Sequence, residues 1–205
     1  MKASVRWVEC PRDAWQGFSR FIPTEEKVAF LNELLEAGFA HLDLTSFVSP
    51  KWVPQMQDAE EVLKALPPPN GRTYLAIVAN EKGLERALAA PNLTHVGYPF
   101  SLSETFQQRN TNRSIEASWP LVGAMVERTE GRLGLVVYLS MAFGNPYGDP
   151  WSVEAVLEAL ARLKEMGVRE IALADTYGVA EPERIHEVLK AAEARFGPEG
   201  LGAHL

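Results

Sequence analysis

Residues 170–205 read EIALADTYGVAEPERIHEVLKAAEARFGPEGLGAHL. The segment Glu170–Ala174 predicts a strand. Glu181–Phe196 predicts a helix with Pro182 in its first turn, where proline is favoured. Another strand begins at Leu201. Strand, helix and strand in this order form the unit from which parallel sheets are built, with the helix packed against the sheet.

The same alternation extends back to the start of the chain. Further strands are predicted at Val5–Glu9, His41–Thr45, Thr73–Val78, Thr94–Tyr98 and Leu133–Leu139. Further helices are predicted at Thr24–Ala37, Asp58–Leu66, Glu81–Ala90, Ser114–Thr129 and Ser152–Met166. We therefore expect about six strand–helix units and the beginning of a seventh strand.

Two α/β architectures fit this alternation, an open doubly wound sheet and a closed (β/α)₈ barrel. A dinucleotide-binding doubly wound sheet carries Gly-x-Gly-x-x-Gly after its first strand. Here the first predicted strand is followed by Cys10–Trp15, which contains no glycine. The sequence favours an incomplete TIM barrel that occupies residues 1–205 as a single domain, because no linker-like stretch divides it.

Composition restricts the function classes. Hydrophobic residues make up 46% of the chain and charged residues 23%, as in ordinary soluble proteins. The net charge of -7 argues against a nucleic-acid partner. The single cysteine, Cys10, cannot form an internal disulfide, and no signal peptide or membrane span is apparent. We expect a cytoplasmic protein without a membrane partner.

Polar side chains recur where the predicted strands end. In a TIM barrel these ends, and the loops after them, form the active site. Each residue taken alone has an ordinary interpretation, because Asp and Ser are common in turns. Together, carboxylates, an arginine and a histidine require a cation or a charged substrate to balance them. The set comprises Arg12, Asp13, Asp43, Ser46, Asn80, Ser101, Ser140, Asp175 and His204.

Two residues of this set are candidate metal ligands. Hard divalent cations take oxygen ligands such as Asp13, and borderline metals also accept an imidazole such as His204. Catalytic sites commonly use three protein ligands, so these two alone do not complete a site. The other histidines are weaker candidates, because His41 and His95 begin strands and His186 lies in the last helix.

Several segments carry a family resemblance. The most specific is Thr45–Met56, TSFVSPKWVPQM, which is followed by Asp58. The chain resembles the hydroxymethylglutaryl-CoA lyase family, in the metal-dependent lyase superfamily with a TIM barrel. The other matching segments are PRD at 11–13 with Gln16, residues 106–116, GNPY at 144–147 and DTYG at 175–178.

The resemblance implies a retro-Claisen cleavage of 3-hydroxy-3-methylglutaryl-CoA (HMG-CoA) to acetyl-CoA and acetoacetate. It implies an acyl-CoA substrate, a divalent metal (Mg²⁺ or Mn²⁺), and a place in leucine degradation and ketone-body formation. Arg12 would stabilise the thioester enolate, and Asp43 stands where the family has a glutamate. The implied site residues are Arg12, Asp43 and Asp175 as catalytic residues, Gln16 and Ser46 as substrate-binding residues, and Asp13 and His204 as metal ligands.

The chain also departs from the family pattern. Ala14 and Trp15 replace Gly and Leu. If the glycine position requires a positive φ or a close approach of substrate, Ala14 introduces strain there, and Trp15 is expected to add bulk at the rim. Asp43 is one methylene shorter than the family's glutamate. A second ligand histidine is expected two residues after His204, whereas the sequence ends at Leu205. From this truncated form we expect little or no turnover.

Two alternatives remain open from the sequence. The first is a non-catalytic relic or self-associating module of the same fold, and the second is a related lyase acting on another acyl-CoA or oxo acid. Open sheet edges favour association, so we expect a homo-oligomer, most simply a dimer. The specific loop from Ser46 to Met56 argues against the related lyase.

Overall fold

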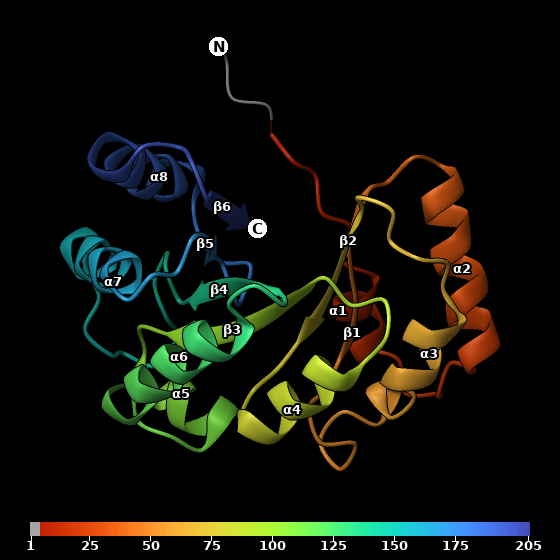
Figure 1. The fold of residues 1–205 in the computed structure, drawn as a ribbon. Helices are drawn as coiled ribbons and strands as arrows, with labels where there is room; N and C mark the ends of the chain where they lie inside the picture. The colour runs from red at the N-terminus through yellow and green to blue at the C-terminus, as the bar shows by residue number, and fades with distance from the viewer. Residues whose placement is uncertain (1–4) are drawn as a thin grey trace. The chain divides into compact units, whose positions relative to one another are not determined.

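The computed structural model describes residues 5–205 (Figure 1). The strands in this range are β1 (His41–Ser46), β2 (Thr73–Ile77), β3 (His95–Ser101), β4 (Gly134–Ser140), β5 (Glu170–Ala174) and β6 (Leu201–His204). The helices are α1 (Pro11–Gln16), α2 (Thr24–Glu36), α3 (Ala59–Ala65), α4 (Glu81–Ala89), α5 (Glu104–Thr111), α6 (Ile115–Thr129), α7 (Val153–Glu165) and α8 (Pro182–Phe196), with a 3₁₀ turn η1 at Pro54–Met56.

The strands follow one another in the sheet in chain order, β1-β2-β3-β4-β5-β6. The chain forms two compact units. We call residues 5–97 with 129–134 the N-terminal unit, and residues 98–128 with 135–205 the C-terminal unit. Strand β3 contributes its first part, to Gly97, to one unit and its second part, from Tyr98, to the other. A single domain over residues 1–205 stays a prediction.

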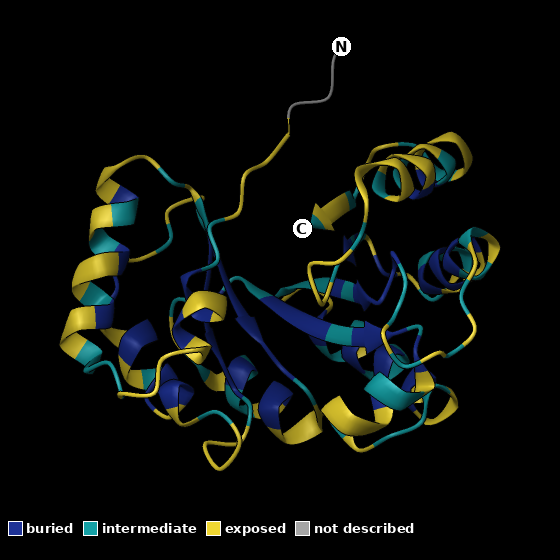
Figure 2. Cartoon of the chain, turned by 180° about the vertical axis from the view of Figure 1, so that it is seen from behind, coloured by how far each residue is buried: buried dark blue, intermediate teal, exposed yellow. Residues whose placement is uncertain are grey.

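In the N-terminal unit, β1 and β2 run parallel, with His41 opposite Thr73. The register of this pair shifts between Asp43 and Thr45. Every residue of β1 after His41 is buried, as expected of a parallel strand covered on both faces. Helices α2 and α3 pack together, and their exposed faces contrast with the buried strands in Figure 2.

In the C-terminal unit, β5 lies between β4 and β6 and is parallel to both. Helices α7 and α8 pack against one another. The turn before β6 requires a glycine at position 200. Gly200 has φ +70°, and a Cβ there would lie 1.9 Å from the carbonyl oxygen of Arg169.

The predicted strand at Val5–Glu9 is wrong in extent. Only Glu9 pairs with β1, through an isolated parallel bridge to Leu42. Pairing stops after it because α1 begins at Pro11, which has no N–H to donate. Before it, Trp7 is 68% exposed and has no buried face to hold a strand in place.

The remaining predicted elements are present, and their bounds are close to the expected ones. Strand β5 has the predicted limits, and every predicted helix is found within one residue at each end. Helices α1 and α5 were not expected. The parallel strand order with intervening helices confirms the TIM-barrel type of fold. No helix within residues 5–205 combines the length and apolar character needed to cross a bilayer.

Candidate functional site

The centre of the N-terminal candidate site is a buried ion pair between α1 and β1. The guanidinium of Arg12 donates from Nε to both carboxylate oxygens of Asp43 at 3.2 Å, and from Nη2 to Oδ2 at 2.5 Å. Arg12 is 8% exposed and Asp43 is fully buried. Buried charges are tolerated when they are paired and hydrogen-bonded, and this contact also fixes the plane of the guanidinium.

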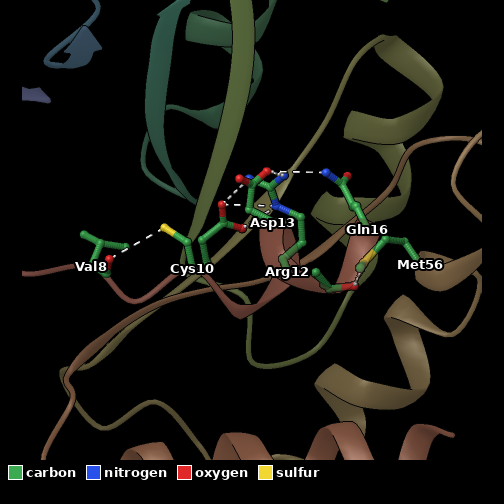
Figure 3. Close-up of polar contacts among 8 residues, drawn as sticks. Val8, Cys10, Arg12, Asp13, Gln16 and Met56 are labelled. Atoms are coloured by element: carbon green, nitrogen blue, oxygen red, sulfur yellow. Dashed lines mark hydrogen bonds and ion pairs between the residues drawn. The ribbon is translucent and has the colours of Figure 1, made fainter. Parts of the chain in front are cut away.

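Asp13 extends this pair toward solvent. Its Oδ1 accepts from Arg12 Nη1 at 2.8 Å and from Gln16 Nε2 at 3.4 Å, and its side chain is half exposed (Figure 3). Asp13 and Gln16 are three residues apart in α1, so they lie on the same face of the helix. The structure thus brings four predicted site residues together: Arg12, Asp13, Gln16 and Asp43.

Ser46 closes β1 and is buried. Its hydroxyl accepts a hydrogen bond from the N–H of Val48 at 3.2 Å, which shapes the first turn of the following loop. The predicted substrate-binding side chain therefore also has a local structural role.

A buried network that the sequence did not predict holds this loop. Lys27 Nζ donates to Asp58 Oδ1 at 2.6 Å and to the carbonyl oxygen of Gln55. Asp58 Oδ2 accepts from the Thr24 hydroxyl at 2.8 Å. Lys27 is 1% exposed and also lies 4.4 Å from the centre of the Phe21 ring. We call Thr24, Lys27, Gln55 and Asp58 the loop anchor.

Cys10 lies next to the ion pair, but its thiol has little tendency to ionise. Burial, followed by the charge of Asp43, raises the pKa of its thiol to about 12. The thiol donates to the carbonyl oxygen of Val8 at 3.6 Å (Figure 3). A neutral thiol is a poor nucleophile, which favours a structural over a reactive interpretation of Cys10. The residue is only partly buried, not fully buried as the sequence suggested.

In the C-terminal unit, Asp175 and His204 lie at the ends of adjacent strands. Ala174 is the register partner of His204, and the N–H of Asp175 donates to the carbonyl oxygen of His204 at 2.9 Å. The Asp175 carboxylate accepts from the N–H of Ala180 at 2.9 Å, and the His204 ring meets Tyr138 edge to face at 5.7 Å. The predicted site residues are thus divided between the two units. Asp175 and His204 lie in the C-terminal unit, and the N-terminal unit contains the other five: Arg12, Asp13, Gln16, Asp43 and Ser46.

The other strand-end residues have structural roles. Asn80 caps α4 by accepting from the N–H of Gly83 at 2.9 Å. The Ser101 hydroxyl accepts from the N–H of Ser103, and Ser140 accepts through its carbonyl oxygen from Leu102.

The positive-φ condition at Ala14 and the rim position expected for Trp15 are both wrong. Ala14 lies within helix α1 and has no left-handed φ, so its side chain imposes no backbone strain. Trp15 is 8% exposed and packs edge to face against Phe30 of α2 at 6.0 Å, so it belongs to the core instead of the rim.

The metal donors in the described part of the chain are few. Within residues 5–205, no group of three or more His, Cys, Asp or Glu side chains is arranged to hold a metal ion. Asp13 offers a half-exposed carboxylate, which suits a hard cation, but one oxygen already accepts from Arg12. The described residues therefore fall short of a three-ligand catalytic site.

Comparison with known proteins gives a consistent set of relatives. A sequence profile of the HMGL-like family matches residues 4–201. The chain is 35% identical to hydroxymethylglutaryl-CoA lyase YngG of Bacillus subtilis over 195 residues, which cover 95% of this chain and 65% of that protein. The chain thus spans slightly less than two thirds of this relative.

Solved structures agree. The crystal structure of the Bacillus subtilis HMG-CoA lyase matches with a TM-score of 0.90 and 35% identity, covering 97% of this chain and 67% of that one. An HMG-CoA lyase from Acinetobacter baumannii, solved in complex with coenzyme A and 3-methylmalate, matches with a TM-score of 0.91 and 29% identity, covering 97% and 65%.

Proposed function

Because this chain belongs to the HMGL-like family, we propose that it carries the catalytic arginine centre of an HMG-CoA lyase. The reaction is the cleavage of HMG-CoA to acetyl-CoA and acetoacetate. The observation that carries the proposal is the buried Arg12–Asp43 pair beside the half-exposed Asp13. The match to lyases over 95% of the chain supports it.

Arg12 suits the charge that this cleavage develops. Loss of the proton from the 3-hydroxyl drives formation of the acetoacetate carbonyl, and the electrons of the breaking carbon–carbon bond move onto the thioester oxygen. A guanidinium held in place by Asp43 stabilises that oxygen without having to reorganise. The resulting enolate then gains a proton on carbon to give acetyl-CoA. Asp43 is thus proposed to position Arg12.

The remaining assignments are part of the same proposal. Gln16 at the end of α1 and Ser46 at the end of β1 contribute substrate contacts, and Asp175 acts directly after β5. Support comes from their placement where the barrel architecture has its active site. The related-lyase alternative differs in the substrate, which would be another acyl-CoA or an oxo acid.

A bound Mg²⁺ or Mn²⁺ would supply Lewis-acid catalysis to the substrate oxygens. Asp13 and His204 are the proposed ligands, each to be tested by its own variant, because the described donors do not complete a site. Calorimetric titration with Mn²⁺ should show weaker binding after Asp13→Asn and after His204→Ala. Unchanged affinity in either variant removes that residue from the metal site.

The test of the activity is acetoacetate release from HMG-CoA by the purified chain, with and without Mn²⁺. Because the described donors do not complete a metal site, we expect only slow cleavage, measurable at high enzyme concentration and stimulated by Mn²⁺. Arg12→Ala should lower this rate by about 100-fold or more, as loss of an oxyanion donor does. Arg20→Ala is the matched control, because the Arg20 side chain is 82% exposed and its ion pair with Glu26 is long, at 3.8 Å. Absence of metal-stimulated cleavage at high enzyme concentration would overturn the proposal.

The wider setting follows from the proposed reaction. A role in leucine degradation and ketone-body formation, a cytoplasmic location and a homodimer remain proposals that depend on it. Sedimentation of the purified chain tests the dimer directly, and a monomer at every concentration contradicts it.

A further inference from the structure

A partly exposed aromatic cluster lies on helix α5 and two loops of the C-terminal unit. Phe106 and Arg109 come from α5, Tyr147 from the loop after β4, and Tyr177 from the loop after β5. We call these four residues the rim cluster. None of them belongs to the catalytic set, and no role is predicted from the sequence for the three aromatic residues.

The rings of the rim cluster meet around Tyr177. Tyr147 and Tyr177 lie edge to face with centroids 5.9 Å apart, and their hydroxyls are hydrogen-bonded. Phe106 meets Tyr177 on another side at 6.4 Å. Tyr177 is nonetheless 49% exposed, so a large ring surface is presented to solvent.

Arg109 adds a positive charge at the same place. Its guanidinium lies 4.9 Å from the centre of the Tyr147 ring, and Phe106 and Arg109 share one face of α5. Among the described residues 5–205 this guanidinium has no carboxylate partner. An exposed arginine held over an aromatic ring is suited to a phosphate group.

A hydrogen-bond network fixes the loop that carries Tyr147. The Asp149 carboxylate accepts from the Ser103 hydroxyl at 2.5 Å and from the N–H of Thr105 at 2.9 Å, which ties the loop to the start of α5. Asn145 accepts from the N–H of Tyr147 at 3.0 Å. The rings are therefore held ready before any ligand arrives, which lowers the entropic cost of binding.

We propose that the rim cluster binds the adenine nucleotide half of the acyl-CoA, with adenine against Tyr177 and a phosphate on Arg109. This inference rests on the proposed function and deepens it. Aromatic rings stack with any flat heterocycle, adenine included, and an arginine guanidinium donates hydrogen bonds to phosphate oxygens. Tyr177 follows the predicted catalytic Asp175 by two residues, so the cluster is close in the chain to that residue of the proposed site. The coenzyme A bound to the Acinetobacter baumannii relative supports this class of ligand.

Calorimetric titration with coenzyme A, and with adenosine 3′,5′-bisphosphate as the nucleotide half alone, tests the proposal. Tyr177→Ala and Arg109→Ala should each raise the Kd for both probes about tenfold, the size expected from losing one stacked ring or one phosphate contact. Tyr177→Phe keeps the ring and should stay within about twofold. Arg162→Ala is the matched control and should change neither Kd, because Arg162 lies over Trp119 at 4.0 Å on α7.

The outcomes separate this inference from the proposed cleavage. No binding of coenzyme A, or equal Kd values for wild type, Tyr177→Ala and Arg109→Ala, overturns the nucleotide site. Acetoacetate release from 3-hydroxy-3-methylglutaryl-pantetheine, which lacks the nucleotide, is measured in parallel. Cleavage of that compound alongside unchanged Kd values refutes the rim cluster and leaves the lyase proposal standing. Weaker coenzyme A binding in the variants, with no cleavage of either substrate by the wild-type chain, supports the rim cluster and refutes the lyase proposal.

Discussion

At the residue scale, the decisive observation is that one buried carboxylate holds one buried guanidinium. The sequence placed Arg12, Asp13 and Asp43 near the same strand ends, because they follow or lie in adjacent predicted strands. It did not predict which carboxylate would be buried, since Asp13 and Asp43 are chemically alike. The structure makes Asp43 the partner that fixes Arg12 and leaves Asp13 half exposed.

Asp43→Asn should be strongly destabilising, because it removes the buried counter-charge of Arg12 and leaves only the half-exposed Asp13 paired with the guanidinium. We expect a loss of about 3 to 5 kcal/mol in the free energy of unfolding, measured in urea. Asp43→Glu keeps the charge and should cost less than Asp43→Asn. Equal losses for both variants would show that packing, and not the ion pair, holds this position.

Cys10 should resist alkylation in the folded chain. Its pKa of about 12 leaves almost no thiolate at pH 8. We therefore expect iodoacetamide to react with Cys10 at least about 100-fold more slowly than with a peptide thiol. The folded chain keeps this proton while the unfolded chain releases it near the ordinary value of 9.0. The free energy of unfolding should therefore fall as the pH rises from about 9 to 12. Rapid labelling at pH 8 without unfolding would contradict the burial.

At the element scale, periodic apolar patterns predicted the long helices well and the short polar ones poorly. Helix α5, ETFQQRNT, has no apolar stripe and depends on the Ser103 cap and on the buried Gln107 side chain. Helix α1 has six residues, too few for a period to be visible. The strand at residues 5–9 failed for the opposite reason, since its composition suits a strand but only Glu9 finds a partner.

The loop anchor should act as a coupled unit. Lys27→Met and Asp58→Asn each leave one buried charge without its partner, so we expect each to lower the free energy of unfolding by about 3 kcal/mol or more. The double variant should lose less than the sum of the two. Glu154→Gln is the control, because its pair with Arg195 is exposed and should contribute less than about 1 kcal/mol. Additive losses would mean that the two residues act independently.

Gly200 and Gly197 offer a matched pair of substitutions before β6. Both have positive φ, but a Cβ at Gly197 meets no atom within 4 Å, whereas one at Gly200 meets the Arg169 carbonyl oxygen. Gly197→Ala should cost about 1 kcal/mol from backbone strain alone. Gly200→Ala should cost more by about 1 to 3 kcal/mol, because the backbone must move. Equal thermal denaturation shifts would contradict this geometry.

At the scale of the whole molecule, the order of elements was the most predictable property. Alternating strands and helices with short connections permit few topologies, and parallel strands in chain order are the barrel solution. The division into two compact units was not predictable, because β3 belongs to both and no break in composition marks it. The loop anchor was equally unpredictable from the sequence, since a lysine in a helical pattern normally lies on the solvent-exposed face.

The net charge of -7 predicts how the chain behaves toward polyanions. We expect no retention on a heparin or double-stranded DNA column at about 0.1 M salt, where basic surfaces bind strongly. Coenzyme A should still bind, because its phosphates need only a local arginine. Retention that disappears in higher salt would indicate a basic surface large enough to outweigh the net charge.

The Lys27–Asp58 contact also limits the routes by which this sequence can diverge. Because each partner is buried, either substitution alone passes through a form with an uncompensated charge. Natural variation at these two positions should therefore occur in concert, as paired replacements or not at all. Descendants of this gene that lose the lysine would be expected to have lost the aspartate as well.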